Sequence, residues 1–337
     1  MNPYAVSQAQ FERANEAMWA RFNADTSALL KRAAPPGFDP ELYALRYRTV
    51  CKHLALAQGR GYSPSLVAYL ADLASKGHGA VYDNPVSLRR RFWRWFSREA
   101  PFALRDARGY VLAAHALFYI PMIAVALLCY VKPPLAYSVV GPEAIAGAEA
   151  AFAEYGRHYA QMESAEFSEL FMMFGYYALN NIGIAFRVLV SSVALLLPLL
   201  IVSLSNSADI GATMGYLSQT DSAFGFWAFV CSHSAFELTG ITLSIAGGMM
   251  IGTAFFRRDG RTLSQSLRFA GRRATPLLSL SFLLLFVAAL IEGFWSNQTS
   301  IWAPLRYALA AASWLFALYY VFFARAGRKR PERWQDY

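Results

Sequence analysis

The feature that most constrains this fold is a long apolar segment, residues 222–255, with ionisable groups near its middle. A helix needs about 20 apolar residues to cross a bilayer, so this segment is long enough to span one. It nevertheless contains His233 and Glu237. Ionisable groups are costly in hydrocarbon and usually face a partner or a water-filled cavity. The segment is therefore predicted to be a transmembrane helix with a polar site inside it.

One face of this predicted helix is both polar and small. His233 and Glu237 lie four residues apart, so their side chains share a face within hydrogen-bonding reach of each other. Small residues continue the same stripe and its border, with the small-xxx-small spacing that lets helix backbones approach closely. We therefore predict that this face packs inside a helix bundle. The predicted helix-packing residues here are Gly240, Ser244, Gly247, Gly248 and Gly252.

The rest of the chain fits a membrane protein as well. Of its 337 residues, 56% are hydrophobic and 16% are charged, and the apolar residues gather in segments of about 20. The net charge is +9, but the basic residues lie beside apolar segments, as the positive-inside rule requires, so binding to nucleic acid is not indicated. The three cysteines lack paired spacing, so no disulfide framework and no zinc site is predicted.

These patterns predict an all-α protein, a polytopic transmembrane helix bundle of about six spans. Six arginines in residues 256–273 indicate a cytoplasmic loop, which places both termini in the cytoplasm. The stretch 168–219 is too long for one span and divides into two short spans meeting near 187–192 or into two re-entrant halves. The predicted parts are a cytoplasmic helical region (1–84), an amphipathic interfacial helix (85–104), a transmembrane domain (105–325) with an extracytoplasmic helical segment (135–168), and a basic cytoplasmic tail (326–337).

The first hundred residues predict three helices and a fourth, amphipathic one. The three cover about 6–33, a stretch opening at 39–41, and 63–75, where Gly77 and Gly79 are expected to end the helix. In the fourth, aromatic residues fill one half of the helical wheel and arginines the other, which is typical of a helix in the headgroup layer. A helix packed on the preceding bundle is the alternative. The predicted headgroup-binding residues are Arg90, Arg91, Arg94 and Arg98.

Further polar residues interrupt the apolar segments. They either form hydrogen bonds between helices or line a cavity with His233 and Glu237, and the sequence leaves both open. Glu292 lies at the end of an apolar run and is expected at the outer interface. Gly211 and Gly215 are predicted to pack on the small stripe of residues 240–252. The other polar residues of this candidate site are Asn180, Asn181, Asn206 and Asp209.

Several of these motifs occur together in a known family. Asn180-Asn181 before an apolar span, Asn206 with Gly211 after it, the pair His233 and Glu237, and the late IEGFWS motif carry the likeness. Over residues 105–325 the chain resembles the stage II sporulation protein M family of integral membrane proteins. Small serines at 207 and 234 stand where the family pattern has glycine. In spore formers the family implies a membrane partner of cell-wall-degrading proteins, and elsewhere an accessory membrane component.

Three functions are weighed on this basis. The first is a non-enzymatic membrane scaffold or assembly partner, dimeric and in contact with other membrane proteins. The second is a transport subunit energised by a separate cytoplasmic ATPase, since the chain has no phosphate-binding loop and its layout is analogous to that of exporter permeases. An intramembrane hydrolase is disfavoured because His233 and Glu237 supply only two metal ligands. No cofactor or metal is predicted, and the expected location is the bacterial cytoplasmic membrane.

Overall fold

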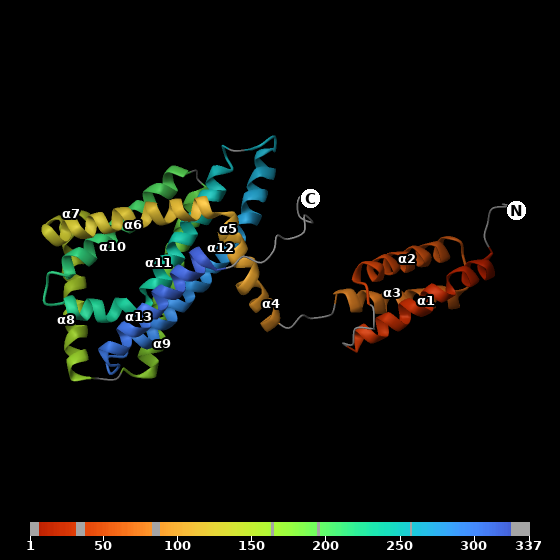
Figure 1. Ribbon diagram of the computed structural model, residues 1–337, viewed down its shortest axis with the longest axis horizontal. Coiled ribbons are helices and arrows are strands. Elements are labelled where there is room, and N and C mark those ends of the chain that lie inside the picture. The colour runs from red at the N-terminus through yellow and green to blue at the C-terminus, as the bar shows by residue number, and fades with distance from the viewer. Residues whose placement is uncertain are drawn as a thin grey trace. The chain divides into compact units, whose positions relative to one another are not determined.

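The computed structural model describes residues 7–31, 38–82, 88–162, 165–193, 196–256 and 258–324. Within these ranges every regular element is a helix, which confirms the all-α class. The chain divides into two compact units, Met1–Phe92 and Trp93–Tyr337 (Figure 1). The segment expected to be one amphipathic helix, residues 85–104, therefore extends across the boundary between the units.

The first unit contains the three predicted helices. Ser7 begins the first with a capping box, and Asp39 caps the second, whose first residue is a proline. His53 is half-buried and accepts a hydrogen bond of 3.0 Å from Trp19 Nε1. These helices are α1 (Gln8–Leu30), α2 (Pro40–Gly59) and α3 (Pro64–Tyr82).

The third helix does not end where the sequence predicted. Gly77 lies inside α3, so the expectation that the helix stops near residue 75 is wrong. A β-carbon at Gly77 would lie 2.6 Å from the ring of Phe22 and 2.9 Å from that of Tyr47. The glycine is therefore explained by close packing against these two rings, and its helix-breaking tendency is overridden by tertiary contact.

The second unit contains the membrane-spanning helices. Among the described residues, five helices are long and apolar enough to cross a membrane, and a further helix, α9, has 27 residues, so about six spans is roughly consistent with the structure. The stretch 168–219 contains two long helices, of which the first ends at Val193 and the second begins at Leu196, close to the expected meeting point near 187–192. The helices are α6 (Arg108–Val131), α9 (Phe167–Val193), α10 (Leu196–Leu217), α11 (Ala223–Thr253), α12 (Leu263–Leu290) and α13 (Ala303–Leu318).

Helix α11 is the centre of this unit. It packs against α6, α9, α10, α12 and α13, and most of its residues are buried (Figure 1). The other spanning helices bury a smaller part of their surface and expose large apolar side chains, among them Ile120, Leu179 and Leu197. An apolar exposed face suits contact with lipid. The residues that the sequence singled out on α11 therefore lie inside the bundle.

Shorter elements complete the unit. The predicted extracytoplasmic segment contains two helices, α7 (Leu135–Val139) and α8 (Pro142–Gln161). Helix α8 packs against the start of α11, where a β-carbon on Gly225 would collide with the carbonyl oxygen of Phe152. Helix α12 continues as the π-helix η2 (Ile291–Ser296), and α13 continues as the π-helix η3 (Tyr319–Phe323).

The arginine-rich stretch 256–273 is mostly helix, which corrects the prediction of a loop. Thr262 and Gln265 form a capping box that starts α12, so Arg268, Arg272 and Arg273 lie on its first turns. Arg273 also forms an ion pair of 2.7 Å with Asp106 at the end of α5 (Ala100–Asp106). The cap begins the helix well before the apolar run. A hydropathy pattern detects only the apolar run, so it misses the polar first turns of the helix.

Candidate functional site

A polar cluster lies inside the second unit, around His233 of α11. Its Nδ1 is 3.0 Å from the hydroxyl oxygen of Ser296 in η2. Its Nε2 lies 3.7 Å from Glu237 Oε2 and 3.9 Å from Glu292 Oε1. The imidazole is buried, so the ring joins the two carboxylates on one side and the hydroxyl on the other. The structure thus places His233 and Glu237 together, as their spacing predicted, and adds Glu292 as a third ionisable group.

The burial of Glu292 corrects the sequence-based expectation of an interfacial carboxylate. Only 7% of this residue is exposed. The apolar run ends there, but the helix continues as the π-helix η2 and keeps residues 292 and 296 facing the interior. Gly293 allows this, because a β-carbon there would lie 2.6 Å from the Cα atom of Phe174 in α9. π-helical turns are rare and often mark functional sites.

Asn181 connects the cluster to α9. This side chain is fully buried, and its Nδ2 donates a hydrogen bond of 3.2 Å to Glu292 Oε2. Asn180, which is exposed, donates from Nδ2 to Asn181 Oδ1 at 3.2 Å. Both asparagines therefore belong to the network: Asn181 binds Glu292, and Asn180 binds Asn181.

The other two predicted polar residues lie elsewhere. Asn206 and Asp209 are on α10, half-buried and exposed respectively. Among the described residues, no hydrogen bond or ion pair joins either side chain to His233, Glu237 or Glu292. The structure therefore brings together the polar residues of α9, α11 and η2 but not those of α10.

Arg306 is a buried charge that the sequence analysis missed. It lies on α13 with no exposed surface, and it donates hydrogen bonds to the carbonyl oxygens of Ile301 (3.2 Å), Ala228 (3.2 Å), Ser296 (3.1 Å) and Gln298. Ser296 is thus held by Arg306 through its carbonyl while its hydroxyl contacts His233. One feature of the sequence could have revealed Arg306: it lies on the side expected to be extracytoplasmic, where the positive-inside rule does not favour arginine.

Three groups in this cluster could hold a metal ion. The ligand atoms of His233, Glu237 and Glu292 all lie within 4.8 Å of one another. The set offers one imidazole nitrogen and two carboxylate oxygens, a combination that can share a proton or coordinate a divalent cation. The sequence analysis counted two ligands, because the third is 55 residues further along the chain from Glu237.

The predicted helix-packing residues of α11 contact three different helices. Gly240 and Gly247 face Leu285 and Leu278 of α12, and Ser244 Oγ lies 2.7 Å from Ser281 Oγ on the same helix. The other two members of the stripe face α9 and α10. A β-carbon on Gly248 would lie 2.5 Å from Leu199, and one on Gly252 would lie 2.8 Å from Leu196. Each of these positions has a neighbour too close for a larger side chain.

Gly211 and Gly215 of α10 pack on α6, which overturns the prediction that they pack on the stripe of α11. A β-carbon on either glycine would collide with backbone atoms, those of Met122 and Ala126 respectively. The nearby Ser207 donates a hydrogen bond of 2.6 Å to the Phe118 carbonyl oxygen, also on α6. The small-residue spacing correctly indicated a close helix contact, but it did not identify the partner helix.

The predicted amphipathic helix of residues 85–104 contains three short helical elements. The predicted headgroup-binding arginines are exposed. The aromatic face is divided, because Phe96 stacks on Tyr320 at 4.7 Å between ring centroids while Phe92 and Trp93 are exposed. Tyr320 OH also donates to the Phe96 carbonyl oxygen. Part of the face expected to meet lipid therefore packs on η3. The elements are α4 (Leu88–Arg94), η1 (Trp95–Glu99) and α5.

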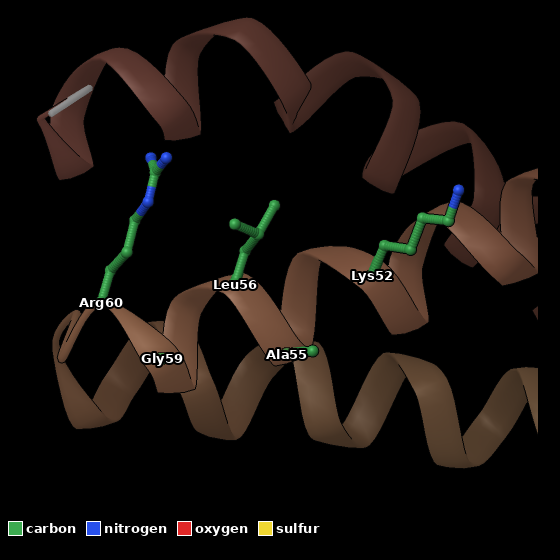
Figure 2. A pocket seen from close by; sticks show the side chains of 5 residues that line it. All are labelled: Lys52, Ala55, Leu56, Gly59 and Arg60. Carbon is green, nitrogen blue, oxygen red and sulfur yellow. The ribbon is translucent and has the colours of Figure 1, made fainter. Parts of the chain in front are cut away.

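The first unit has a shallow groove along α2, with a volume of about 560 Å³. Lys52, Leu56 and Arg60 project to the same side of the helix (Figure 2). Ala55 and Gly59 complete the lining, so the groove combines two basic groups with small and apolar ones. It contains no acid, thiol or imidazole, and it has no arrangement for acid–base or nucleophilic chemistry.

Comparisons with known proteins agree with this division into two units. A model of a domain of unknown function, DUF8413, matches residues 9–83, which cover α1 to α3. No curated protein and no solved structure matches the chain. The model of the family "Stage II sporulation protein M" matches residues 116–297, which is more than half of the chain and includes His233, Glu237 and Glu292. The chain is therefore a multi-pass membrane protein that belongs to the stage II sporulation protein M family.

Proposed function

We propose that this protein is a non-enzymatic scaffold or assembly partner in envelope or cell-wall processes. It resides in the bacterial cytoplasmic membrane as a homodimer, with both termini in the cytoplasm. It works with other membrane proteins, and Arg90, Arg91, Arg94 and Arg98 contact anionic headgroups. The family supports a membrane role, and the exposed positions of these arginines are compatible with lipid contact.

The polar network is the observation that carries this proposal. Its hydrogen bonds connect α9 through Asn181, α11 through His233 and η2 through Glu292, while Arg306 adds α13. His233, Glu292 and Arg306 thus each contact another helix of the same unit. Such contacts hold helices in a defined arrangement, which a scaffold needs in order to present the same surface to its partner.

A transport subunit is the second candidate, because ionisable groups inside a membrane domain often mark ion or proton pathways. In this function the protein moves a lipid, peptide or other amphiphile. A separate ATPase supplies the energy, since the chain has no phosphate-binding loop. The carboxylates of Glu237 and Glu292 are then the groups that exchange a proton or cation during the cycle.

Purification of the full-length protein in mild detergent separates the two functions. A scaffold is expected to retain wall-remodelling proteins at a fixed ratio, and a transport subunit to retain a nucleotide-binding ATPase. Glu237→Gln keeps shape and hydrogen bonding but removes charge, so a scaffold should keep its partners while a transporter loses activity with its ATPase still bound. Recovery of neither class of partner, with an unchanged envelope after gene deletion, contradicts the scaffold.

Reporter fusions test the proposed orientation. Fusions at Ala150 and Gln298 are expected to report the outside of the membrane, and fusions at Gly260 and at the C-terminus the inside. The reason is the arginine distribution around the spans, with six arginines in residues 256–273. An outside signal at Gly260 would overturn the orientation without affecting the family assignment.

A further inference from the structure

We propose that His233, Glu237 and Glu292 form a binding site for one divalent metal ion of the zinc type inside the membrane domain. The site goes beyond the proposed function, since a scaffold and a transporter could each contain it. The inference rests on three features of the cluster: the spacing of the ligand atoms, the hydrogen bonds that orient them, and the balance of charge.

The three ligand atoms lie close together without forming short hydrogen bonds to one another. His233 Nε2 is 3.7 Å from Glu237 Oε2 and 3.9 Å from Glu292 Oε1, both beyond the usual N–H···O distance of about 2.7–3.2 Å. A tetrahedral zinc ion with bonds of about 2.0–2.2 Å holds its ligands roughly 3.3–3.5 Å apart. The observed separations exceed that spacing by a few tenths of an ångström for the two ion pairs. The two carboxylate oxygens lie within 4.8 Å of each other, so the carboxylates must also approach each other by about 1 Å to close the site.

Neighbouring groups orient two of the three ligands. Ser296 Oγ lies 3.0 Å from His233 Nδ1, which leaves Nε2 to face the carboxylates. Asn181 Nδ2 donates to Glu292 Oε2, so Oε1 is the oxygen that points to the imidazole. The carbonyl of Ser296 is itself held by Arg306 and by Tyr155 OH at 2.6 Å. Hydrogen bonds of this kind to the far side of each ligand are typical of metal sites.

The charge of the cluster calls for a cation. Two carboxylates within 4.8 Å repel each other strongly in a poorly solvated interior. Arg306 does not offset them directly, because among the described residues its hydrogen bonds go to four carbonyl oxygens and none goes to a carboxylate. A divalent ion with two carboxylates and a neutral imidazole gives a net charge of zero. The imidazole ligand favours zinc or a similar transition metal over calcium and magnesium, which prefer oxygen.

The test uses the full-length protein in detergent, stripped with a chelator and reloaded with Zn²⁺ alone. We expect about one zinc per chain by mass spectrometry of the metal and a higher melting temperature on reloading. Glu237→Gln and Glu292→Gln should each weaken zinc binding by at least 100-fold. Asn181→Ala, which removes only an orienting hydrogen bond, should weaken it by about 10–100-fold.

A matched control is available on α8, where His158 and Glu154 form an exposed pair with the same four-residue spacing. His158→Asn should bind zinc as the wild type does. If His158→Asn abolishes binding and the Glu292→Gln variant does not, the ion is held at the surface and the proposal is wrong. Absence of zinc from the reloaded wild-type protein overturns it as well, and this measurement needs no variant to fold. Loss of zinc binding with partners still retained would leave the proposed function intact.

Discussion

Helices α8 and α11 each contain a histidine and a glutamate four residues apart, in opposite order along the chain, and the two pairs differ most in their surroundings. In α8, His158 Nε2 lies 4.0 Å from Glu154 Oε1, and the side chains are 51% and 61% exposed. In α11, His233 Nε2 lies 3.7 Å from Glu237 Oε2, and the side chains are 2% and 18% exposed. Spacing within a helix therefore determines that a pair forms, while burial determines what the pair must contact.

The physical difference lies in solvation. Water screens the exposed pair on α8, so such pairs typically contribute about 0.2–1 kcal/mol. The pair on α11 has lost most of its water, so its remaining lone pairs and protons need partners from other helices. Ser296 and Glu292 supply them. The same two residue types are thus a minor surface feature in one helix and part of a tertiary network in the other.

The largest effect is expected from the arginine that supports the buried network. Arg306→Leu removes the one charged donor that four carbonyl oxygens share, including those of Ala228 and Ser296, so that the Ser296 carbonyl keeps only the neutral Tyr155 OH. Hydrogen bonds from a charged donor contribute about 1.5–3 kcal/mol each, so we expect a loss of at least about 3 kcal/mol. Arg157→Leu on the exposed face of α8 is the matched control and should be neutral. Thermal unfolding in detergent measures both, and equal melting temperatures would contradict the role of Arg306.

A smaller loss is expected from enlarging a glycine on α11. A β-carbon at Gly247 would lie 2.7 Å from Leu278 of α12, so Gly247→Leu forces the two helices apart. Overpacking of this kind costs about 1–3 kcal/mol. A β-carbon added to Gly147 of α8 would have no neighbouring atom within 4 Å, so Gly147→Leu should be tolerated. Unfolding midpoints of both variants decide the matter, and a harmless Gly247→Leu would disprove a tight contact along this stripe.

Removing one carboxylate of the pair Glu237 and Glu292 should have opposite effects on stability with and without metal. In chelator, Glu237→Gln removes one of two carboxylates that lie within 4.8 Å, so we expect a gain of roughly 1 kcal/mol. With Zn²⁺ present the wild type should instead be the more stable protein. Glu154→Gln on α8 should show neither change, because that pair is exposed. The comparison needs only melting temperatures in the two buffers, and identical responses of Glu237→Gln would contradict a charged pair.

The smallest effect concerns His53 of the first unit, a third histidine in an intermediate environment. Burial lowers the pKa of His53 below its usual 6.5, and Trp19 Nε1 donates to its Nδ1, which requires a neutral ring. A lowered folded-state pKa means that the unfolded chain binds the proton more tightly. This contribution to stability is therefore complete above pH 6.5 and is lost as the pH falls below 6.5 toward the folded-state value.

Hydrogen exchange in the full-length protein measures this effect. Amides of α1 and α2 should lose protection in the wild type relative to His53→Phe when the pH is lowered from 7.5 to 5.5. The variants are compared at the same pH, so the intrinsic pH dependence of exchange cancels. A constant difference between wild type and His53→Phe would show that burial does not govern this histidine.

Much of the fold could be predicted because its determinants are local. Apolar runs of sufficient length located spanning helices, and α11 lies within the apolar segment 222–255. Caps such as Ser7 and Asp39 are sequence features that act on their own helix. Two predictions failed for a related reason. The end of α3 was predicted too early because helix propensity takes no account of the aromatic rings that pack on Gly77. The first turns of α12 were predicted to be a loop because the Thr262 cap lies outside the apolar run.

The sequence by itself determined that α11 crosses the bundle with His233 and Glu237 on one small-residue face, because helical spacing is a property of the chain alone. Only the tertiary structure decided that Glu292, Asn181 and Arg306 join them, since these residues come from η2, α9 and α13 and meet through packing. The tertiary structure also decided that Gly211 faces α6 instead of α11. Small residues permit a close approach, but the shape and chemistry of the facing helices select the partner.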